Sequence, residues 1–551
     1  MPRRRIARLP ALLALLAPSF AVAGAAPLAA AESLYADWLD ATYAVATLAA
    51  GPDTRIAGRG ADAWRALAAR RGRELAARLP ALAATALGPA DRRAVAVMQR
   101  TLADAPSVPA AATGDESRAA CARAPDAALG REALSHALYG CFEAYGNHID
   151  FGGKVIVRTT ALELLQELDS ASERRALFRA LEPLFRRINA DDSPASPYRR
   201  LIGLAAAANA GAGGAQIAAA ARTVGASTDE VEAWLMGVLD AWRVANPGPP
   251  LEPWDYWHHY AAGVHVLDAQ IPPERILPLS KRYYRDLGAD LDALGVRHDL
   301  AVRPGKAPLA YSDFVRTGRL VGGRWRPAIA RVSANVEHGG LFVLNEIVHE
   351  DGHAVHASAV RTRPAFFAWG DDLFVEAFAD VPSWSVAEPA WQQRYLGVSV
   401  DAPTALRALY GNVMLDVAWG LFELRMLRAP DADPNAVWSD ITARYLNVVP
   451  HPELSWWALR VQLVDIPGYM INYGLGAILT ADLREQLTAG AGDFSAGNPA
   501  WYGYASQALL RYGASLETPD LLHRFLGRNV SDAALKRALA RIEPRAPAPV
   551  P

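Results

Sequence analysis

Alanine and leucine recur at helical spacing through most of this 551-residue chain, and runs of β-branched residues are rare. The pattern is clearest in five segments: 34–49, 63–86, 158–190, 228–245 and 273–292. Ser227-Thr-Asp-Glu230 forms a capping box, so a helix is expected to begin just after Ser227. The stretch 205–226 is expected to form helices joined by a glycine turn. A chain with this pattern folds as a mainly α protein.

One strand signal interrupts the helical pattern at residues 328–336 (AIARVSANV). Its side chains alternate between two sets, Ala330, Val332, Ala334 and Val336 on one face and Ile329, Arg331, Ser333 and Asn335 on the other. Gly339-Gly340 then breaks the chain, and an apolar helix is expected from Leu341. The sequence therefore predicts a small β-sheet directly before a buried helix.

The N-terminus has the order of an export signal. A basic stretch, MPRRRIARLP, precedes the short apolar run ALLALLAPSFAVA, and cleavage sites follow at Ala21-Val22-Ala23 and Ala29-Ala30-Ala31. The apolar run is too short to span a bilayer and contains Pro18, so a membrane anchor is disfavoured. We expect a cleaved signal peptide, a periplasmic or secreted protein and no stable membrane insertion.

Composition and cysteine usage narrow the partners and ligands. With 52% hydrophobic residues, 21% charged residues and a net charge of −2, the chain is globular and lacks the basic excess of nucleic-acid binders. Its two cysteines, Cys121 and Cys141, suit a disulfide in an exported protein, with two free thiols as the alternative. Without a cysteine cluster, any metal must be bound by histidines and carboxylates.

The main chemical motif is His-Glu-Asp-Gly-His at residues 349–353. On a helix, His349 and His353 lie on one face about 6 Å apart along the axis, so both imidazoles can bind one zinc ion. Glu350 lies roughly 100° round the helix, beside the metal, where a general base acts on water. The preceding LFVLNEIV is strongly apolar, which predicts a buried helix. A solvated helix face or a core histidine pair is the structural alternative.

A catalytic zinc needs a third protein ligand and one open position. His356 lies about 10 Å along the helix from His349, too far to join the pair. Glu376 is the better candidate, because it follows within the apolar helical segment LFVEAFAD. Asp380 lies one turn beyond Glu376 and could accept the free ring N–H of a histidine ligand. The alternative, that both are ordinary surface acids, is disfavoured by their apolar neighbours.

These motifs, in this order, resemble the zinc peptidases that include thimet oligopeptidase, bacterial oligopeptidases and angiotensin-converting enzyme. The similar segments are PAIARVSANV, LNEIVHEDGHAVH and FVEAFAD, which look like that group's edge strand, metal helix and third-ligand helix. Leu251-Glu-Pro-Trp-Asp255 and the C-terminal RYGASLETPDLLHRFLGRNVSDAALKRAL are also similar to it.

The resemblance implies a large two-lobed helical zincin peptidase with a small β-sheet beside the metal helix. It implies zinc bound by His349, His353 and Glu376, Glu350 as catalytic base, and short peptides as substrates in a deep channel. It divides the chain into a signal peptide (1–31), a helical region contributing to both lobes (32–330), a catalytic region (331–543) and a disordered tail (544–551).

A tyrosine that stabilises the oxyanion is also implied, and it falls on Tyr473, with Tyr469 as a weaker second candidate. For both, packing alone is the alternative. The chain departs from the group at two places. Leu463 and Val464 stand where a histidine is expected before the tyrosine, and Asn472 and Val461, with Arg460 nearby, occupy the region that holds a substrate C-terminus. Dipeptide release is therefore not favoured.

The sequence thus predicts an exported zinc metallopeptidase acting on short peptides. Two alternatives stay open: a catalytically silent peptide-binding protein on the same scaffold, and a zinc amidohydrolase acting on non-peptide substrates. The sequence assigns no role to His338, His356 or His451, and it does not decide between endopeptidase, dipeptidyl and carboxypeptidase cleavage.

Overall fold

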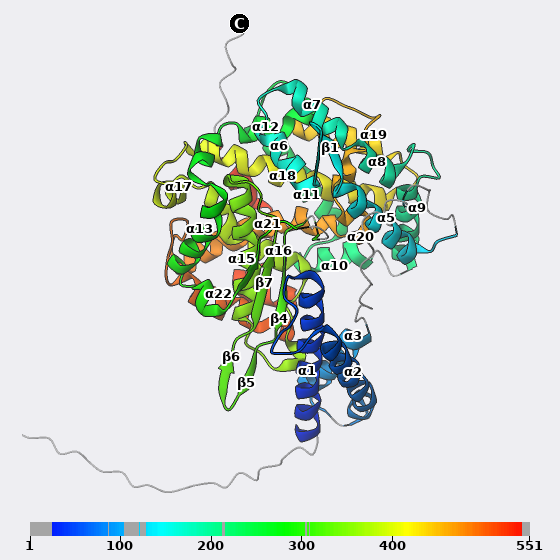
Figure 1. The fold of residues 1–551 in the computed structure, drawn as a ribbon, viewed down its shortest axis with the longest axis vertical. Helices are drawn as coiled ribbons and strands as arrows, with labels where there is room; N and C mark the ends of the chain where they lie inside the picture. The colour runs from blue at the N-terminus through cyan, green and yellow to red at the C-terminus, as the bar shows by residue number, and fades with distance from the viewer. Residues whose placement is uncertain are drawn as a thin grey trace, which may run out of the picture.

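The computed structural model describes residues 25–85, 87–103, 121, 128–211, 215–303, 306–307 and 309–542. The fold is mainly α, as the sequence predicts (Figure 1). The prolines at 106 and 109 predict a loop over 103–118, which lies outside the described residues except for Ala103. The tail 544–551 and the first 24 residues of the signal segment also lie outside them.

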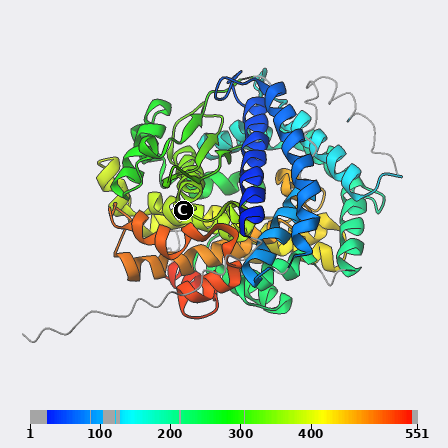
Figure 2. The same cartoon turned by 90° about the horizontal axis from the view of Figure 1, so that it is seen from below.

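Three helices near the N-terminus form a layer of their own at the lower edge of Figure 1: α1 (Ala25–Ala50), α2 (Ala61–Ala83) and α3 (Pro89–Ala103). Figure 2 shows α1 and α2 side by side, and they contact each other along their length. Leu28, Trp38 and Leu79 belong to a separate apolar cluster, which also takes in Phe366. Leu28 and Ala31 are buried, so the ordered body of the protein includes this part of the chain.

The middle of the chain supplies a second set of helices: α5 (Arg131–Gly146), α6 (Arg158–Glu167), α7 (Ala171–Ala180), α8 (Glu182–Asn189), α9 (Pro197–Gly211), α10 (Ala215–Val224), α11 (Thr228–Ala245), α12 (Tyr256–Ala261), α13 (Pro273–Asp286) and α14 (Leu291–Leu294), with the 3₁₀ turns η1 (Pro253–Asp255) and η2 (His265–Gln270). The capping box at Ser227 is present and α11 has the predicted bounds. Segment 158–190, predicted as one helix, is three, because Leu168 is extended and Ser170 caps a new helix.

The C-terminal half contributes α15 (Leu341–Ala359), α16 (Asp372–Ser383), α17 (Pro389–Tyr395), α18 (Ala402–Arg428), α19 (Pro434–Leu446), α20 (Gln462–Asp465), α21 (Met470–Ala491), α22 (Trp501–Ala508), α23 (Thr518–Leu526) and α24 (Ala533–Leu539), with η3 (Pro364–Phe366), η4 (Trp384–Ala387), η5 (Trp456–Leu459) and η6 (Leu510–Ser515). α15 packs on α16, and α16 packs on α21. α21 lies against α18, where Gly474 faces Gly420, so these two glycines allow the helices to pack closely.

Three strands form the sheet beside α15: β3 (Arg297–Asp299), β4 (Tyr311–Arg316) and β7 (Ile329–Ser333). β7 lies in the middle, parallel to β3 and antiparallel to β4. The sequence resemblance had implied an edge strand here, and that expectation is wrong. The backbone of β7 is hydrogen-bonded on both sides, and Arg331 is buried because it pairs with Asp313 at 2.6 Å.

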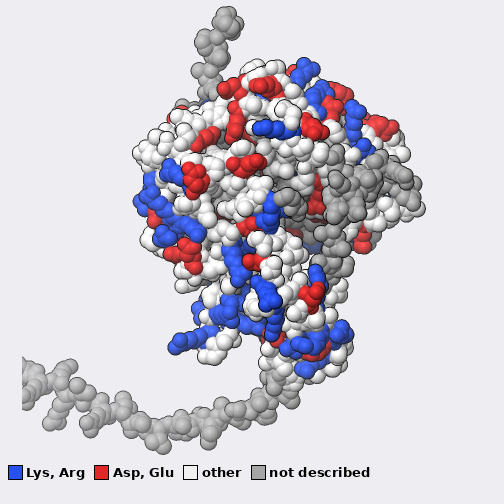
Figure 3. Space-filling model, in the orientation of Figure 1, with Lys and Arg blue, Asp and Glu red and all other residues white. Residues whose placement is uncertain are grey.

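Two small antiparallel hairpins complete the strands: β1 (Ile149–Phe151) with β2 (Lys154–Ile156), and β5 (Arg319–Val321) with β6 (Arg324–Arg326). The second hairpin projects from the molecule beside α1 (Figure 1). On the face drawn in Figure 3, Lys and Arg side chains gather around this hairpin, whereas both signs of charge mix over the upper part of the molecule. On this face the positive charge is therefore concentrated near the hairpin and does not form a continuous stripe.

A single large apolar core runs from α5 to the C-terminal helices and includes Leu344, Ile347 and Val348 of α15. Burial of these side chains fixes the metal-motif helix in the centre of the molecule (Figure 1). Cys121 and Cys141 form a disulfide, as predicted. Among the described helices, none combines the length and apolar character that crossing a membrane requires.

Candidate metal centre

Two glycines, Gly339 and Gly340, directly precede α15, and a larger residue would not fit at either position without strain. A Cβ on Gly339 would lie 2.0 Å from the Ile271 carbonyl oxygen, and Gly340 has a φ of 103°. Asp268 then accepts the backbone N–H of Leu341 at 2.8 Å and caps the helix. The break predicted at these glycines therefore sets both the start and the direction of α15.

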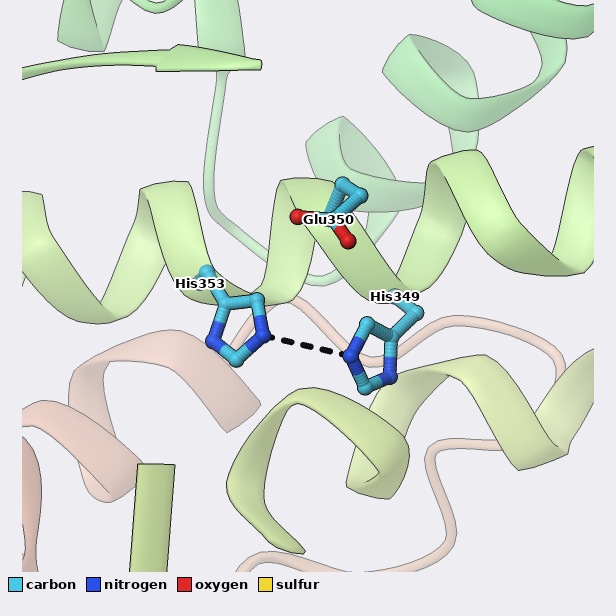
Figure 4. Close-up of side chains that lie close together, drawn as sticks. All are labelled: His349, Glu350 and His353. Atoms are coloured by element: carbon cyan, nitrogen blue, oxygen red, sulfur yellow. Dashed lines mark hydrogen bonds between the residues drawn. The ribbon is translucent and has the colours of Figure 1, made fainter. Parts of the chain in front are cut away.

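His349 and His353 project from consecutive turns of α15, and their rings face each other (Figure 4). Their Nε2 atoms are 3.1 Å apart. The Oε2 atom of Glu376, on α16, lies 3.5 Å from Nε2 of His349 and 3.8 Å from Nε2 of His353. Two imidazole nitrogens and one carboxylate oxygen thus converge on one point, a donor set and spacing that suit a tetrahedral zinc ion with one open position.

Asp380 lies behind this group. Its Oδ1 atom is 2.7 Å from Nδ1 of His349, the ring nitrogen that points away from His353. Burial disfavours the imidazolium of His349, but the nearby carboxylates of Asp380, Glu376 and Glu350 together outweigh burial and raise the pKa of His349 well above its ordinary value. The Asp380 contact holds the proton on Nδ1, so Nε2 is the ring nitrogen that could bind a metal ion once its own proton is lost.

The two other members of the group have opposite electrostatic environments. Burial, followed by the charge on His349, lowers the pKa of His353 to about 4, so its ring is neutral at physiological pH. Burial works against the Glu376 carboxylate, but its contacts with His349 and His353 outweigh burial and lower its pKa. A neutral imidazole beside an ionised carboxylate is the form in which both can bind a cation.

Glu350 is buried beside the same group, and its ligand atoms lie within 4.8 Å of those of His349 and His353. It is turned toward β4, where Ser312 Oγ donates to its Oε2 at 2.8 Å. Burial raises the pKa of Glu350 to about 8, against the opposing effects of His349 and Ser312. This carboxyl is therefore poised to exchange a proton near neutral pH.

Both candidate tyrosines lie near the group, but with different partners. Tyr469, at the start of α21, donates its hydroxyl to Oε1 of Glu376 at 3.2 Å. Tyr473, one turn further on, accepts a hydrogen bond from Nε2 of Gln462 at 3.1 Å. Their ring centroids are 5.8 Å apart. Tyr469 thus contacts the carboxylate of Glu376 directly, whereas Tyr473 interacts with Glu376 and Glu350 only through their charges.

Several supporting residues were missed by the sequence reasoning. Ser312 lies within β4, where it pairs with Val332 of β7, and nothing in its sequence context marks it. Gln462 donates a hydrogen bond to the hydroxyl of Tyr473, close to the place where a histidine was expected. Leu463 and Val464, which stand at that place in the sequence, are buried. Glu423 accepts the backbone N–H groups of Gly468 and Met470 at 2.7 Å each and so holds the turn before α21.

Asp351 anchors the motif from behind. It is fully buried, accepts from Ser280 Oγ at 2.6 Å and lies 2.7 Å from Nε2 of His298. Gly352 faces α16, where a Cβ would lie 2.9 Å from Cα and O of Ala379. The two central positions of the motif thus join α15 to its neighbours, a role that the sequence does not reveal.

The three unassigned histidines lie away from the group. His356 is buried between the rings of Phe374 and Phe378, and burial lowers its pKa to about 3. His451 contacts carboxylates of Glu252 and Glu453 at 2.7 Å each. These two are explained by packing and ion pairing, and His338 lies near Glu167.

Among comparisons with known proteins, only the comparison with solved structures finds a match, and it identifies the fold of this chain. No protein-family model matches this chain, and no curated protein sequence matches it. Three solved structures are similar along nearly the whole length: the M32 carboxypeptidase from Deinococcus radiodurans (16% identity, TM-score 0.55, 94% of this chain and 98% of that one), a carboxypeptidase from Pyrococcus furiosus (12%, 0.52, 94% and 98%) and metallocarboxypeptidase 1 from Trypanosoma cruzi (15%, 0.50, 94% and 99%).

At these identities the likeness establishes the fold alone. The chain has the helical fold of these carboxypeptidases, which agrees with the fold class predicted from its sequence. The resemblance to the thimet oligopeptidase and angiotensin-converting enzyme group remains a prediction from the motifs.

Proposed function

We propose that this protein is a zinc-dependent metallopeptidase that hydrolyses short peptides. The observation that carries the proposal is the convergence of three ligand atoms, Nε2 of His349, Nε2 of His353 and Oε2 of Glu376, at mutual separations of 3.1 to 3.8 Å. Zinc would be held there, and when bound it supplies a Lewis acid and lowers the pKa of water.

The two carboxylates next to this position divide into a ligand and a base. Glu376 faces both histidine nitrogens and has a lowered pKa, as a ligand needs. Glu350 is oriented by Ser312 and has a raised pKa, as a proton carrier needs. In the proposed reaction, Glu350 accepts a proton from the attacking water and returns it to the leaving amine nitrogen. Breaking the peptide bond thus yields a free carboxylate and a free amine.

The oxyanion that develops on the scissile carbonyl needs a donor besides the metal. We assign this role to Tyr473, whose hydroxyl oxygen accepts a hydrogen bond from Nε2 of Gln462 and keeps its own proton free to donate. Tyr469 is the second candidate, and its contact with Glu376 favours a role in orienting that carboxylate.

Two observations favour different cleavage positions in the substrate. The similar solved structures are carboxypeptidases by name, which favours removal of residues from the C-terminus. The motifs favour an oligopeptidase. Mass spectrometry of products from a mixed peptide pool separates single-residue release from internal cleavage and from dipeptide release.

Export to an oxidising compartment is proposed on the signal-like N-terminus and the Cys121–Cys141 disulfide. The division into a helical region and a catalytic region from residue 331 is also retained as a proposal. Of the residues assigned to the reaction, only Ser312 precedes that point.

The test is peptide hydrolysis by the purified protein with zinc, after chelation, and in a Glu350→Gln variant. We expect chelation to abolish cleavage and the variant to lose roughly 10²- to 10⁴-fold in kcat, because a general base contributes about that much. Glu132→Gln, at an exposed site on α5, is the matched control. Cleavage that survives chelation contradicts the zinc role, and a fully active Glu350→Gln protein contradicts the base.

The two alternatives have distinct signatures in the same assay. Stoichiometric zinc and peptide binding without cleavage of any peptide would favour the catalytically silent binding protein. Cleavage of acylated amines but not of peptides would favour a zinc amidohydrolase.

A further inference from the structure

A pocket lies at the N-terminal end of α15, the helix that carries the metal motif. It is enclosed by α6, by η2 and by the first residues of α15, and its lining includes Glu163, Glu167, His265, Asp268 and Phe342. Nothing in the proposed reaction uses these residues. The pocket is rich in carboxylates although it adjoins the centre of the protein.

Glu163 is the residue in this pocket that lacks a partner. Its side chain is only 5% exposed, and its Oε2 atom makes no hydrogen bond. Burial raises the pKa of Glu163 to about 8, and three further carboxylates add to the shift: Glu346, Glu167 and Glu337. No cation among the described residues opposes these effects. A buried carboxylate without a counter-charge is costly, so a cation placed beside it would bind favourably.

Two other acids near Glu163, Asp268 and Glu337, have hydrogen-bond partners within the protein. Glu167, which also lines the pocket, interacts with His338 and His265 through charge. Asp268 caps α15 at Leu341 and lies 2.8 Å from Nδ1 of His265. Glu337 accepts a hydrogen bond from Oγ1 of Thr160 at 3.3 Å. These contacts leave Glu163 as the acceptor that is free for a ligand.

Glu346 connects the pocket to the metal centre. It lies one turn before His349 on α15, and Phe342 lies one turn before Glu346, so the three share one face of the helix. Arg158 is the strongest opposing charge on Glu346, and burial raises the pKa of Glu346 against it. From Phe342 to His349 the helix rises about 10 Å, which is the length of roughly three residues of an extended peptide.

The chemistry of the pocket favours an organic cation over a metal ion. Among the described residues, the acids of this pocket do not lie close enough together to bind a metal ion as a group, whereas the ligand atoms of His349, Glu350 and His353 do. Phe342 presents a large apolar surface to the pocket and is 38% exposed. A methylene chain ending in an ammonium group satisfies both features, with the chain on the aromatic ring and the charge at Glu163.

We propose that the Glu163 pocket binds a primary ammonium group of the peptide substrate, either a lysine side chain or the amino terminus, about three residues from the bond that is cleaved. This inference deepens the proposed function and rests on it for the identity of the ligand as a peptide. It makes the protein selective for cationic peptides.

The experiment compares hexapeptides in which lysine is moved through each position with the same peptides carrying norleucine, which keeps the chain and removes the charge. A third set is acetylated at the amino terminus. For each pair, kcat/KM is measured with the zinc-loaded wild-type protein, Glu163→Gln and the exposed control Glu132→Gln. Dissociation constants for the same peptides are measured calorimetrically with zinc-loaded Glu350→Gln, which removes the need for turnover.

We expect about a tenfold preference for the charged peptide at one position, or for the free amino terminus, expressed in KM rather than kcat. Glu163→Gln should reduce it to twofold or less, whereas Glu132→Gln should retain it. The position at which the preference appears distinguishes a side chain from the amino terminus. Phe342→Ala supplies a second variant, with weaker binding of the lysine and norleucine peptides alike.

Equal treatment of charged and uncharged peptides by the wild-type protein at every position overturns the inference, and so does a preference that Glu163→Gln leaves intact. Hydrolysis of the norleucine peptides would then still support the peptidase. If no peptide is cleaved but calorimetry shows the charge preference in Glu350→Gln, the pocket assignment stands and the proposed function fails.

Discussion

Two glutamates 26 residues apart in the chain, Glu350 and Glu376, illustrate how environment, rather than residue type, divides chemical roles. Two histidines lower the pKa of Glu376 against the effect of burial, whereas burial raises the pKa of Glu350 to about 8. Such a separation between neighbouring carboxyl groups is typical of a site in which one group stays ionised and the other carries a proton. The HExxH spacing and the downstream glutamate were visible in the sequence, but the Ser312 contact that turns Glu350 away from the ligand position was not.

Glu163 gives a pH dependence of stability whose sign follows from its raised pKa. Between its ordinary value near 4.5 and about 8, the unfolded chain carries the ionised form while the folded protein keeps the proton. The folded state therefore binds more protons, and its stability falls as pH rises through this window. Glu163→Gln has no such proton to lose.

We expect the wild-type protein to lose up to about 2.7 kcal/mol relative to Glu163→Gln between pH 6 and pH 9, at about 1.4 kcal/mol per pH unit up to the folded-state pKa. Urea unfolding of both proteins at the two pH values measures this difference, with Glu132→Gln as the control. Parallel pH profiles for wild type and Glu163→Gln would show that Glu163 does not titrate in this range.

At the scale of elements, the site depends on how closely α15 approaches α16. Gly352 makes this approach possible, because a Cβ there would lie 2.9 Å from backbone atoms of Ala379 and 3.2 Å from the Tyr284 hydroxyl. Backbone atoms in a packed helix cannot give way cheaply. The spacing between the two histidines and Glu376 therefore depends on a residue that is not itself one of the proposed ligands.

Gly352→Ala should destabilise the protein by about 1 to 2 kcal/mol, since overpacking costs more than the roughly 1 kcal/mol that alanine gains in helix propensity. It should also weaken zinc binding, because α16 carries Glu376 and must move. Unfolding curves and competition with a zinc chelator measure the two effects. Gly503→Ala on α22, where nothing lies within 4 Å of the new Cβ, is the matched control and should be neutral or stabilising.

At the scale of the whole molecule, the proposed metal would join helices that already belong to one core. α15 and α16 both bury apolar residues in the large cluster that runs to the C-terminal helices. An ion held by both would act as a crosslink that only the folded state can bind. The stability of the entire fold should then depend on the metal.

Removing zinc should lower the thermal midpoint by several degrees, since a ligand at 100 times its Kd stabilises the folded state by about 2.7 kcal/mol. Zinc should restore the midpoint and magnesium should not, because two imidazole ligands favour zinc. Differential scanning calorimetry with and without chelator provides the measurement. Glu376→Gln should make the midpoint much less sensitive to chelation, and an unchanged response in that variant would argue against Glu376 as a ligand.

The amino-acid sequence by itself determined the helical class, the disulfide partners, the start of α11 and the segments from which the candidate site is built. These follow from local patterns: periodicity, capping residues, and the i, i+4 spacing of two histidines. Alternation also predicted a strand over 328–336, and β7 (Ile329–Ser333) confirms it. The family resemblance gave this strand the wrong position in the sheet, because its pairing partners lie in other segments of the chain.

Only the tertiary structure decided which groups surround each carboxylate. Ser312 reaches Glu350, Gln462 reaches Tyr473, and Glu163 is left without a partner through contacts between segments that are distant in sequence. Burial and the distance between charges set a pKa and an affinity, and both are properties of the packed chain. A local pattern can name the residue that does the chemistry, whereas its protonation, its orientation and its neighbours come from long-range packing.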